Sequence, residues 1–189
     1  VVEASAGFTL SGSVIYDNAA GGFASDALSS SVNLTNNVFR GIAGDETRDQ
    51  DTHILAAGNT VAVTGNSVYL NGTTPFSVLR NQNIGIWIEA GVNVSITDNT
   101  VYNINEGFVI VTNGNGTTGA ISGNLARDNG FGFQIYGTSG VFAQFFGNTA
   151  RDNQFTGVRA GGWFELYENS ITENDTGIEM IHGVYHSVV

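Results

Sequence analysis

The chain has 189 residues, a formal net charge of −11, no cysteine, and six arginines without any lysine. This length suits about one domain, and the lack of cysteine excludes disulfides and thiolate metal sites. The acidic balance argues against nucleic acid as a partner. No apolar run approaches the roughly 20 residues that cross a bilayer, so membrane insertion is not predicted either.

The N-terminal stretch VVEASAGFTL (1–10) has no helical periodicity and leads directly into a motif that recurs along the chain. The motif places a polar residue, usually Asn, just before a short apolar stretch. Seven positions carry this mark: Ser13, Asn37, Asn66, Asn99, Asn124, Asn148 and Asn169. The spacings are 24, 29, 33, 25, 24 and 21 residues. A period of roughly 20–50 residues is the signature of a repeat architecture.

Two sets of short apolar stretches alternate with these marks. One set precedes the mark, as in VAVTGN (61–66) and FELYEN (164–169), and the other follows it, as in GFQIYG (132–137). Their period of two predicts half-buried strands, and no segment sustains a helical period. A single unit cannot bury its apolar face, so the units must stack to form a core.

The G-N-x-x-x-x-N unit, followed by a G-I/F/V-x-I/M strand, resembles the right-handed parallel β-helix repeat proteins. This is the architecture of pectate lyases, alginate epimerases and many surface proteins. The resemblance covers about residues 7–183. It implies an all-β fold, with residues 1–189 forming a single-domain right-handed parallel β-helix of about seven coils, one for each of the seven marks.

In such a fold, equivalent positions of successive coils stack at about 4.8 Å, so a repeated turn Asn is expected to form a hydrogen-bonded ladder. A second Asn follows the mark by five positions in five units. Arg127 and Asp128 should lie over Arg151 and Asp152, with diagonal Arg–Asp pairs. The expected ladder residues are Asn37, Asn66, Asn99, Asn124, Asn148 and Asn169, with Asn129, Asn153 and Asn174.

The segment GDETRDQDTHI (44–54) concentrates charge in a long insertion. Asp45, Asp49 and Asp51 are candidate Ca²⁺ ligands, and His53 is a candidate acid or base. The alternative is a solvated charged loop, because the pattern of a dedicated calcium loop is missing. Ca²⁺ is therefore the one candidate cofactor, and the other expectation is no cofactor.

Alternation within the later strands of each unit assigns their faces. Ile86, Phe108, Phe133, Val158 and Ile178, each with the residue two positions on, should point inward. One outward column should hold Trp87, Val109, Gln134, Arg159 and Glu179, and the next Glu89, Val111, Tyr136 and Gly161.

This outward face is a candidate polysaccharide groove. Aromatic rings stack on sugars and arginine forks onto a uronate carboxylate. Trp87, Tyr136 and Gln134 are the candidate substrate-binding residues. Arg159, Glu179 and Glu89 are candidate catalytic residues, with Arg159 or His53 as the base. The resemblance also implies a groove here, because β-helix lyases act on this face. The alternative is that Arg159 and Glu179 merely form an ion pair between coils.

Both ends of the chain are apolar, including GIEMIHGVYHSVV (177–189), and neither resembles a polar cap. An uncovered β-helix end exposes strand edges. Val1, Val2, Val188 and Val189 are therefore expected to contact another subunit, and head-to-tail contact of unlike ends builds a filament.

The sequence thus favours an extracellular or cell-surface structural subunit that associates with itself, end to end or laterally, into a filament or surface assembly. The alternative is a carbohydrate-active module that binds or cleaves an acidic polysaccharide, of the lyase or epimerase type. An attachment spike is a third reading. An enzyme is the less favoured one, because the chain lacks the Asp-Asp pair and the Asp-Pro-His motif of β-helix enzymes.

Overall fold

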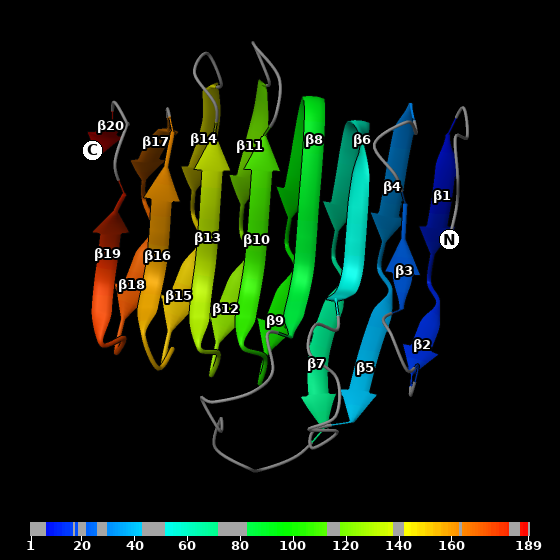
Figure 1. Cartoon of the computed structure of the whole chain (residues 1–189), viewed down its shortest axis with the longest axis horizontal. Coiled ribbons are helices and arrows are strands. Elements are labelled where there is room, and N and C mark those ends of the chain that lie inside the picture. The colour runs from blue at the N-terminus through cyan, green and yellow to red at the C-terminus, as the bar shows by residue number, and fades with distance from the viewer. Residues whose placement is uncertain are drawn as a thin grey trace.

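The computed structural model describes residues 7–16, 18, 22–25, 30–42, 52–71, 83–112, 118–137, 142–162, 164–181 and 186–188. These residues form twenty β-strands and no helix, and so none of them belongs to a helix that could cross a membrane. The strands stack in parallel into a rod, with β1 and β20 at opposite ends (Figure 1). The predicted all-β parallel β-helix is confirmed.

One wall of the rod is a seven-stranded sheet, and each of its strands follows one of the seven marks. Its strands are β2 (Val14–Tyr16), β5 (Val38–Ile42), β7 (Ser67–Asn71), β9 (Thr100–Tyr102), β12 (Leu125–Arg127), β15 (Thr149–Arg151) and β18 (Ser170–Thr172). The mark residue therefore sets the phase of each coil.

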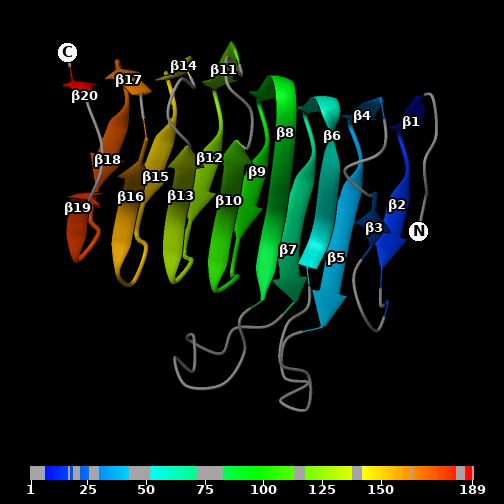
Figure 2. The ribbon, with the colours of Figure 1, turned by 45° about the horizontal axis from the view of Figure 1, so that its top comes forward.

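The rest of the rod is a thirteen-stranded sheet with two arms, joined because two long strands run through both (Figure 2). Arm A contains β3 (Phe23–Ala24), the first part of β6 (Thr52–Thr64) and of β8 (Ile84–Thr97), β10 (Glu106–Thr112), β13 (Phe131–Gly137), β16 (Thr156–Gly161) and β19 (Thr176–Met180). Arm B contains β1 (Phe8–Ser11), β4 (Ser31–Thr35), the later parts of β6 and β8, β11 (Thr118–Ser122), β14 (Phe142–Phe146), β17 (Phe164–Tyr167) and β20 (His186–Val188).

The core runs along the axis of the rod as columns of apolar side chains. Phe108 and Phe133 stack at 4.6 Å between ring centroids, and Phe145 meets Phe133 edge-on at 5.0 Å. The inward columns predicted for arm A are buried at 0% exposure, and their members are Ile86, Ile88, Phe108, Ile110, Phe133, Ile135, Val158 and Ala160.

The last coil departs from this pattern. Ile178 and Met180 lie in register with Val158 and Ala160, so they continue the inward columns. They are nevertheless 40% and 39% exposed. The reason is that β19 ends the order of arm A and, among the described strands, pairs with β16 alone.

Candidate functional site

The marks form a continuous chain of hydrogen bonds along the rod. At each step the Oδ1 of one Asn accepts from the backbone N–H and the side-chain amide of the Asn one coil earlier, at 2.9–3.2 Å. The members are Asn37, Asn66, Asn99, Asn124, Asn148 and Asn169. The first five are at most 1% exposed. Their amides are used within the fold, so they act as scaffold and not as ligands.

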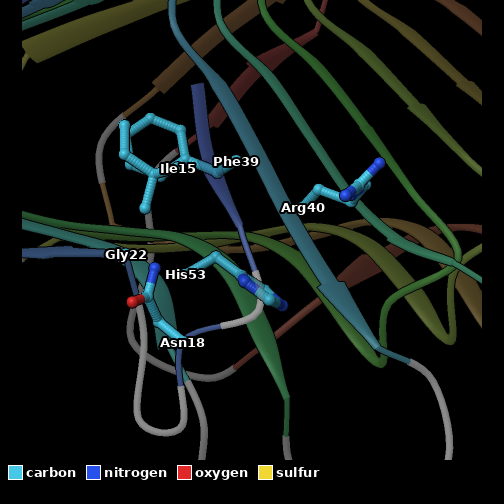
Figure 3. Close-up of a pocket in the computed structure, with 6 residues that line it drawn as sticks. All are labelled: Ile15, Asn18, Gly22, Phe39, Arg40 and His53. Carbon is cyan, nitrogen blue, oxygen red and sulfur yellow. The ribbon is translucent and has the colours of Figure 1, made fainter. Parts of the chain in front are cut away.

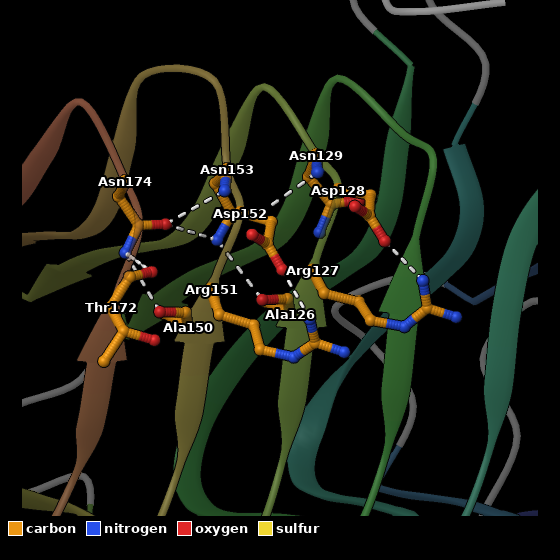
Figure 4. Close-up of polar contacts among 10 residues, drawn as sticks. All are labelled: Ala126, Arg127, Asp128, Asn129, Ala150, Arg151, Asp152, Asn153, Thr172 and Asn174. Atoms are coloured by element: carbon orange, nitrogen blue, oxygen red, sulfur yellow. Dashed lines mark hydrogen bonds and ion pairs between the residues drawn. The ribbon is translucent and has the colours of Figure 1, made fainter.

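A second Asn ladder lies at the turns that follow the last strands of the seven-stranded sheet (Figure 4). Asn129 Oδ1 accepts from the N–H of Ile104 at 3.1 Å, and Asn153 Oδ1 accepts from the N–H of Asn129 at 3.2 Å. Asn174 Oδ1 accepts from both the N–H and the amide of Asn153, at 3.0 and 2.8 Å. This ladder thus links the last coils at a second corner of the rod.

The arginines beside the second ladder stack as expected, but the expected diagonal pairing is wrong. Arg127 lies in register with Arg151. Each binds the aspartate next to it in its own coil, Asp128 or Asp152 (Figure 4). These aspartates have φ of 55° and 56°, and this turn conformation brings each carboxylate beside the preceding arginine.

The outward side of arm A carries a set of polar and aromatic residues that we call the Trp87 face. Strand register places the predicted members in two columns, one led by Trp87 and the other by Glu89. Although outward, Val109 and Gln134 are only 5% and 4% exposed, so the face is not an open, solvated stripe. Its members are Trp87, Glu89, Glu106, Gln134, Tyr136, Arg159 and Glu179.

Five of these side chains form one cluster across β10, β13, β16 and β19. The Tyr136 hydroxyl donates to Gln134 Oε1 at 2.6 Å. Arg159 Nε lies 3.3 Å from Glu179 Oε2, with about a third of each side chain exposed. The ion pair named as the alternative for these two residues is therefore present, but it belongs to a larger network.

Burial perturbs two acids in this cluster. It raises the pKa of the Glu106 carboxyl, and the Gln134 amide and the Arg159 guanidinium oppose this only in part. Burial also raises the pKa of Tyr136; Arg159 opposes this, while Glu106 and Glu179 add to it. Groups with shifted pKa values gather at functional sites more often than elsewhere. Sequence reasoning missed Glu106, because simple alternation places it on the inward side with Phe108.

Three N–H donors of the Trp87 face are buried without an acceptor: Trp87 Nε1, Gln134 Nε2 and Arg159 Nε. Two of these donors nevertheless have a carboxylate beside them: a hydrogen bond from Gln134 acts to lower the pKa of Glu106, and Arg159 Nε forms an ion pair with Glu179. A buried donor left unpaired costs about 1–3 kcal/mol. Among the described residues, Trp87 Nε1 is therefore the buried donor of this face that has neither a hydrogen bond nor an ion pair.

Other predicted residues lie away from this cluster. Glu89 is two coils from Tyr136, with Val111 between them in register. Asp45, Asp49 and Asp51 lie outside the described residues, as do Val1, Val2 and Val189. Val188 is described only as part of the backbone of β20.

The structure does not bring His53 to the Arg159 cluster, so its role as the alternative base stays a prediction. Strand β6 begins at Thr52, so His53 belongs to a strand and not to the charged loop, and it is 8% exposed. Four steps along arm A separate β6 from β16, which carries Arg159. Burial lowers the pKa of His53 to about 4, so the ring is neutral at pH 7.

A column that the sequence analysis overlooked runs along the outside of the seven-stranded sheet. Arg40 Cζ lies 5.0 Å from the Tyr16 ring, and Arg127 Cζ lies 4.2 Å from the Tyr102 ring. The Tyr69 and Tyr102 rings stack at 4.8 Å. Because these groups cover one another, the column packs the surface and offers few open ring faces. In strand order it reads Tyr16, Arg40, Tyr69, Tyr102, Arg127 and Arg151.

Comparison with protein families agrees with this architecture. Residues 45–188 match the family model NosD, described as periplasmic copper-binding protein. The chain belongs to the NosD family. No curated protein and no solved structure gives a significant match to it. The periplasmic description of the NosD family is consistent with the expected location outside the cytoplasm.

The NosD description raises the question of a copper site. Copper in proteins prefers thiolate, thioether and imidazole ligands, and the chain has no cysteine. Within the described ranges no three His, Asp or Glu side chains come together as a metal-binding group. His53 Nε2 makes no hydrogen bond, but the small pocket that His53 lines with Ile15, Asn18, Gly22, Phe39 and Arg40 offers no second imidazole and no carboxylate or thioether (Figure 3). The described residues therefore do not fit a copper site.

Proposed function

We propose that this member of the NosD family is an extracytoplasmic β-helix that binds a polysaccharide chain on the Trp87 face. The observation that supports this is the buried Trp87 Nε1, which has no acceptor among the described residues and lies on the same face as Gln134 and Arg159. A sugar chain supplies hydroxyl and ring oxygens as acceptors, and an indole ring offers an apolar surface with one polar atom. Trp87 and Arg159 are partly exposed, so a small side-chain rotation brings their N–H groups to a ligand.

The charges of the face favour a neutral polysaccharide. Glu89, Glu106 and Glu179 are carboxylic acids, while Arg159 is the one arginine of the face and already pairs with Glu179. A uronate would meet like charge here, and like charges brought together at an interface oppose binding. The acidic polysaccharide expected from the sequence is therefore the weaker fit to this face.

The cluster supports binding better than cleavage. Cleavage of a glycosidic bond by acid–base catalysis needs a proton donor and a proton acceptor poised on either side of the bond. The pKa values of Glu106 and Tyr136 are both raised, so both groups are shifted toward holding their protons. Two groups shifted in the same direction are not the acid and base pair that this chemistry requires.

The test is a screen of the protein against immobilised neutral polysaccharides and uronate polymers, followed by titration calorimetry with a soluble form of each hit. We expect a neutral glycan to bind. Trp87→Phe keeps an aromatic ring but removes the N–H, and a lost hydrogen bond of about 1.4 kcal/mol weakens binding about tenfold. Arg159→Gln should weaken it similarly.

Tyr16→Phe is the control for an aromatic substitution away from this face, and it should bind as the unaltered protein does. It removes a hydroxyl from a tyrosine that lies on the seven-stranded sheet and is 55% exposed. Binding that survives both Trp87→Phe and Arg159→Gln would exclude the Trp87 face. Binding of uronate polymers alone would overturn the neutral class, and no binding across the screen would overturn the function.

Self-association remains a second candidate function, supported by the exposed edge at β19. Ile178 and Met180 occupy core columns yet are 40% and 39% exposed. A parallel strand added at this edge would cover them and would pair the free backbone groups of β19. A second copy of this chain, contributing a strand of its opposite edge, is the occupant that we propose.

A further inference from the structure

The outward side of arm B carries a regular array of short polar side chains over its first five coils, where β1, β4, β6, β8 and β11 lie side by side (Figure 1). Three columns of residues cross these strands in register. The first column is Ser11, Thr35, Thr64, Thr97 and Ser122. The second is Thr9, Asn33, Ala62, Ser95 and Ala120. The third is Ser31, Thr60, Asn93 and Thr118. We call this array the hydroxyl face, because ten of its fourteen residues are serine or threonine.

The hydroxyl face repeats in two directions. Neighbouring strands of a parallel sheet lie about 4.8 Å apart, and side chains on one face of a strand follow one another at about 6.6 Å. The register between β6 and β8 shifts between Gly58 and Thr60 and then runs unbroken to Thr64, so the shift lies before the array begins. The result is a two-dimensional lattice of hydroxyl groups, which suits a partner whose own surface is a lattice.

The fold holds this lattice in place from beneath and from the side. Val63, Ile96 and Ile121 alternate with its residues and lie in the core at 0% exposure. The first Asn ladder runs along the adjoining corner and binds the carbonyls that end these strands. Thr64 and Thr97 share a hydrogen bond between their Oγ1 atoms at 3.0 Å. The hydroxyl groups are therefore ordered before any partner arrives, and pre-organisation lowers the cost of binding.

Strand propensity alone does not explain the composition of this face. Valine, isoleucine and aromatic residues suit strands as well as threonine does, and other outward faces of the same coils carry such residues or charges, as at Tyr69, Trp87 and Glu89. The fourteen described residues of the hydroxyl face include no aromatic, large aliphatic or charged side chain, although the chain has a net charge of −11. So neutral a surface fits an uncharged partner, and it offers no ring on which a sugar could stack.

We propose that the hydroxyl face binds the surface of ice. Each oxygen in ice donates two hydrogen bonds and accepts two, and a serine or threonine hydroxyl donates one and accepts up to two. Such a hydroxyl can therefore take the place of a lattice water. A repeating array contacts many lattice waters at once, whereas a small dissolved molecule would contact only part of it. A mineral surface made of ions would require charged side chains, which this face lacks. The Trp87 face lies on arm A, so the two surfaces bind independently.

Slow growth of ice in a solution of the unaltered protein tests the proposal. Ice grown on a cooled probe excludes dissolved proteins, whereas a protein that binds the ice surface is incorporated. The unaltered protein should therefore be found in the ice fraction. In a droplet that holds a single ice crystal, it should also keep the freezing point below the melting point.

Ser95→Arg places a long charged side chain at an exposed position in the middle of the array. The charge would lose its solvation against ice, and its length would hold the neighbouring hydroxyls off the surface. Incorporation and the freezing gap should therefore be lost, whereas Ser95→Thr keeps a hydroxyl and should retain both. Ser170→Arg is the matched control, because it makes the same change at an exposed serine of the seven-stranded sheet. Ser170→Arg and Trp87→Phe should act on ice as the unaltered protein does.

The proposal is overturned if the unaltered protein is excluded from ice and leaves no gap between freezing and melting, or if a folded Ser95→Arg acts on ice as the unaltered protein does. Binding to microcrystalline cellulose or chitin that Ser95→Arg abolishes, without an effect on ice, would assign the face to a crystalline glycan and overturn ice as the partner. Self-association that Ser95→Arg abolishes, again without an effect on ice, would assign the face to a second copy of this chain. The first measurement needs no variant, so it decides the matter even if Ser95→Arg does not fold.

Discussion

His53 makes the stability of the rod depend on pH through one buried imidazole. Its pKa is about 4 in the folded state, against 6.5 for an ordinary histidine. Above pH 6.5 the ring is neutral in both states, so pH has no effect through this group. As pH falls from 6.5 to 4, the His53 imidazole becomes protonated in the unfolded state but stays neutral in the folded state. The free energy of unfolding should therefore fall by about 3 kcal/mol in total.

Urea unfolding in gluconate buffer at pH 7.5 and pH 5 measures this effect, because most carboxylates stay ionised over that range. His53→Gln removes the titrating group, so the variant should lose less stability on acidification than the unaltered protein, by about 2 kcal/mol at pH 5. Equal losses in the two proteins would show that His53 is not the group responsible.

The Asn ladder predicts that an Asn→Ala substitution lowers the free energy of unfolding more in the middle of the ladder than at its end. Asn124→Ala leaves the backbone N–H of Asn99 and one N–H of its side-chain amide without an acceptor, while the other amide N–H keeps the Val63 carbonyl. Two unpaired buried donors should lower the free energy of unfolding by about 3 kcal/mol. Asn169→Ala, at the partly buried last rung, should cost clearly less, because water can replace it. Denaturant titration compares the two, and equal costs would contradict a cooperative ladder.

At the scale of the element, the repeat period and its Asn marks made much of the fold predictable. The marks set the phase of each coil, and alternation then assigned both the buried core columns and the outward columns of arm A. Neither argument needs tertiary information, since equivalent positions of neighbouring coils must stack. This is why the ladder positions and most inward residues follow directly from the sequence.

Contacts between particular side chains were harder to predict from the sequence. Every residue three positions after a mark, up to Arg151, is Tyr or Arg, so the column on the seven-stranded sheet was visible but unused. Glu106 could not be assigned, because its contact with Gln134 departs from simple alternation. The small pocket beside His53 is lined by residues from different coils, and no local pattern indicates it.

Gly119 on strand β11 is predicted to be a position where even alanine destabilises the fold. Gly119 has a φ of 148°, and a Cβ there would lie 1.8 Å from the carbonyl oxygen of Val94 on β8. Gly119→Ala must therefore separate two paired strands and should lower the free energy of unfolding by at least about 2 kcal/mol. Gly177→Ala on β19 is the control, because its nearest atom would be 3.9 Å away. Thermal unfolding should shift for the first variant and hardly for the second.

At the scale of the whole molecule, a solenoid holds together through contacts between neighbouring coils, and each end has only one neighbour. Arm A shows the consequence. The same two columns are fully buried at Val158 and Ala160 on β16, but 40% and 39% exposed one coil later, at Ile178 and Met180. We therefore expect another chain to bind at this edge.

Self-association through β19 should be visible in sedimentation velocity as a mass that rises with protein concentration. Ile178→Asp places a charge on the apolar edge, where burial against a second copy would require its desolvation, so this variant should remain monomeric. Val92→Asp is the matched control, because Val92 is 51% exposed on β8, away from this edge; it should associate as the unaltered protein does. A monomeric unaltered protein at all concentrations, or equal association of Ile178→Asp, would exclude β19 as the contact.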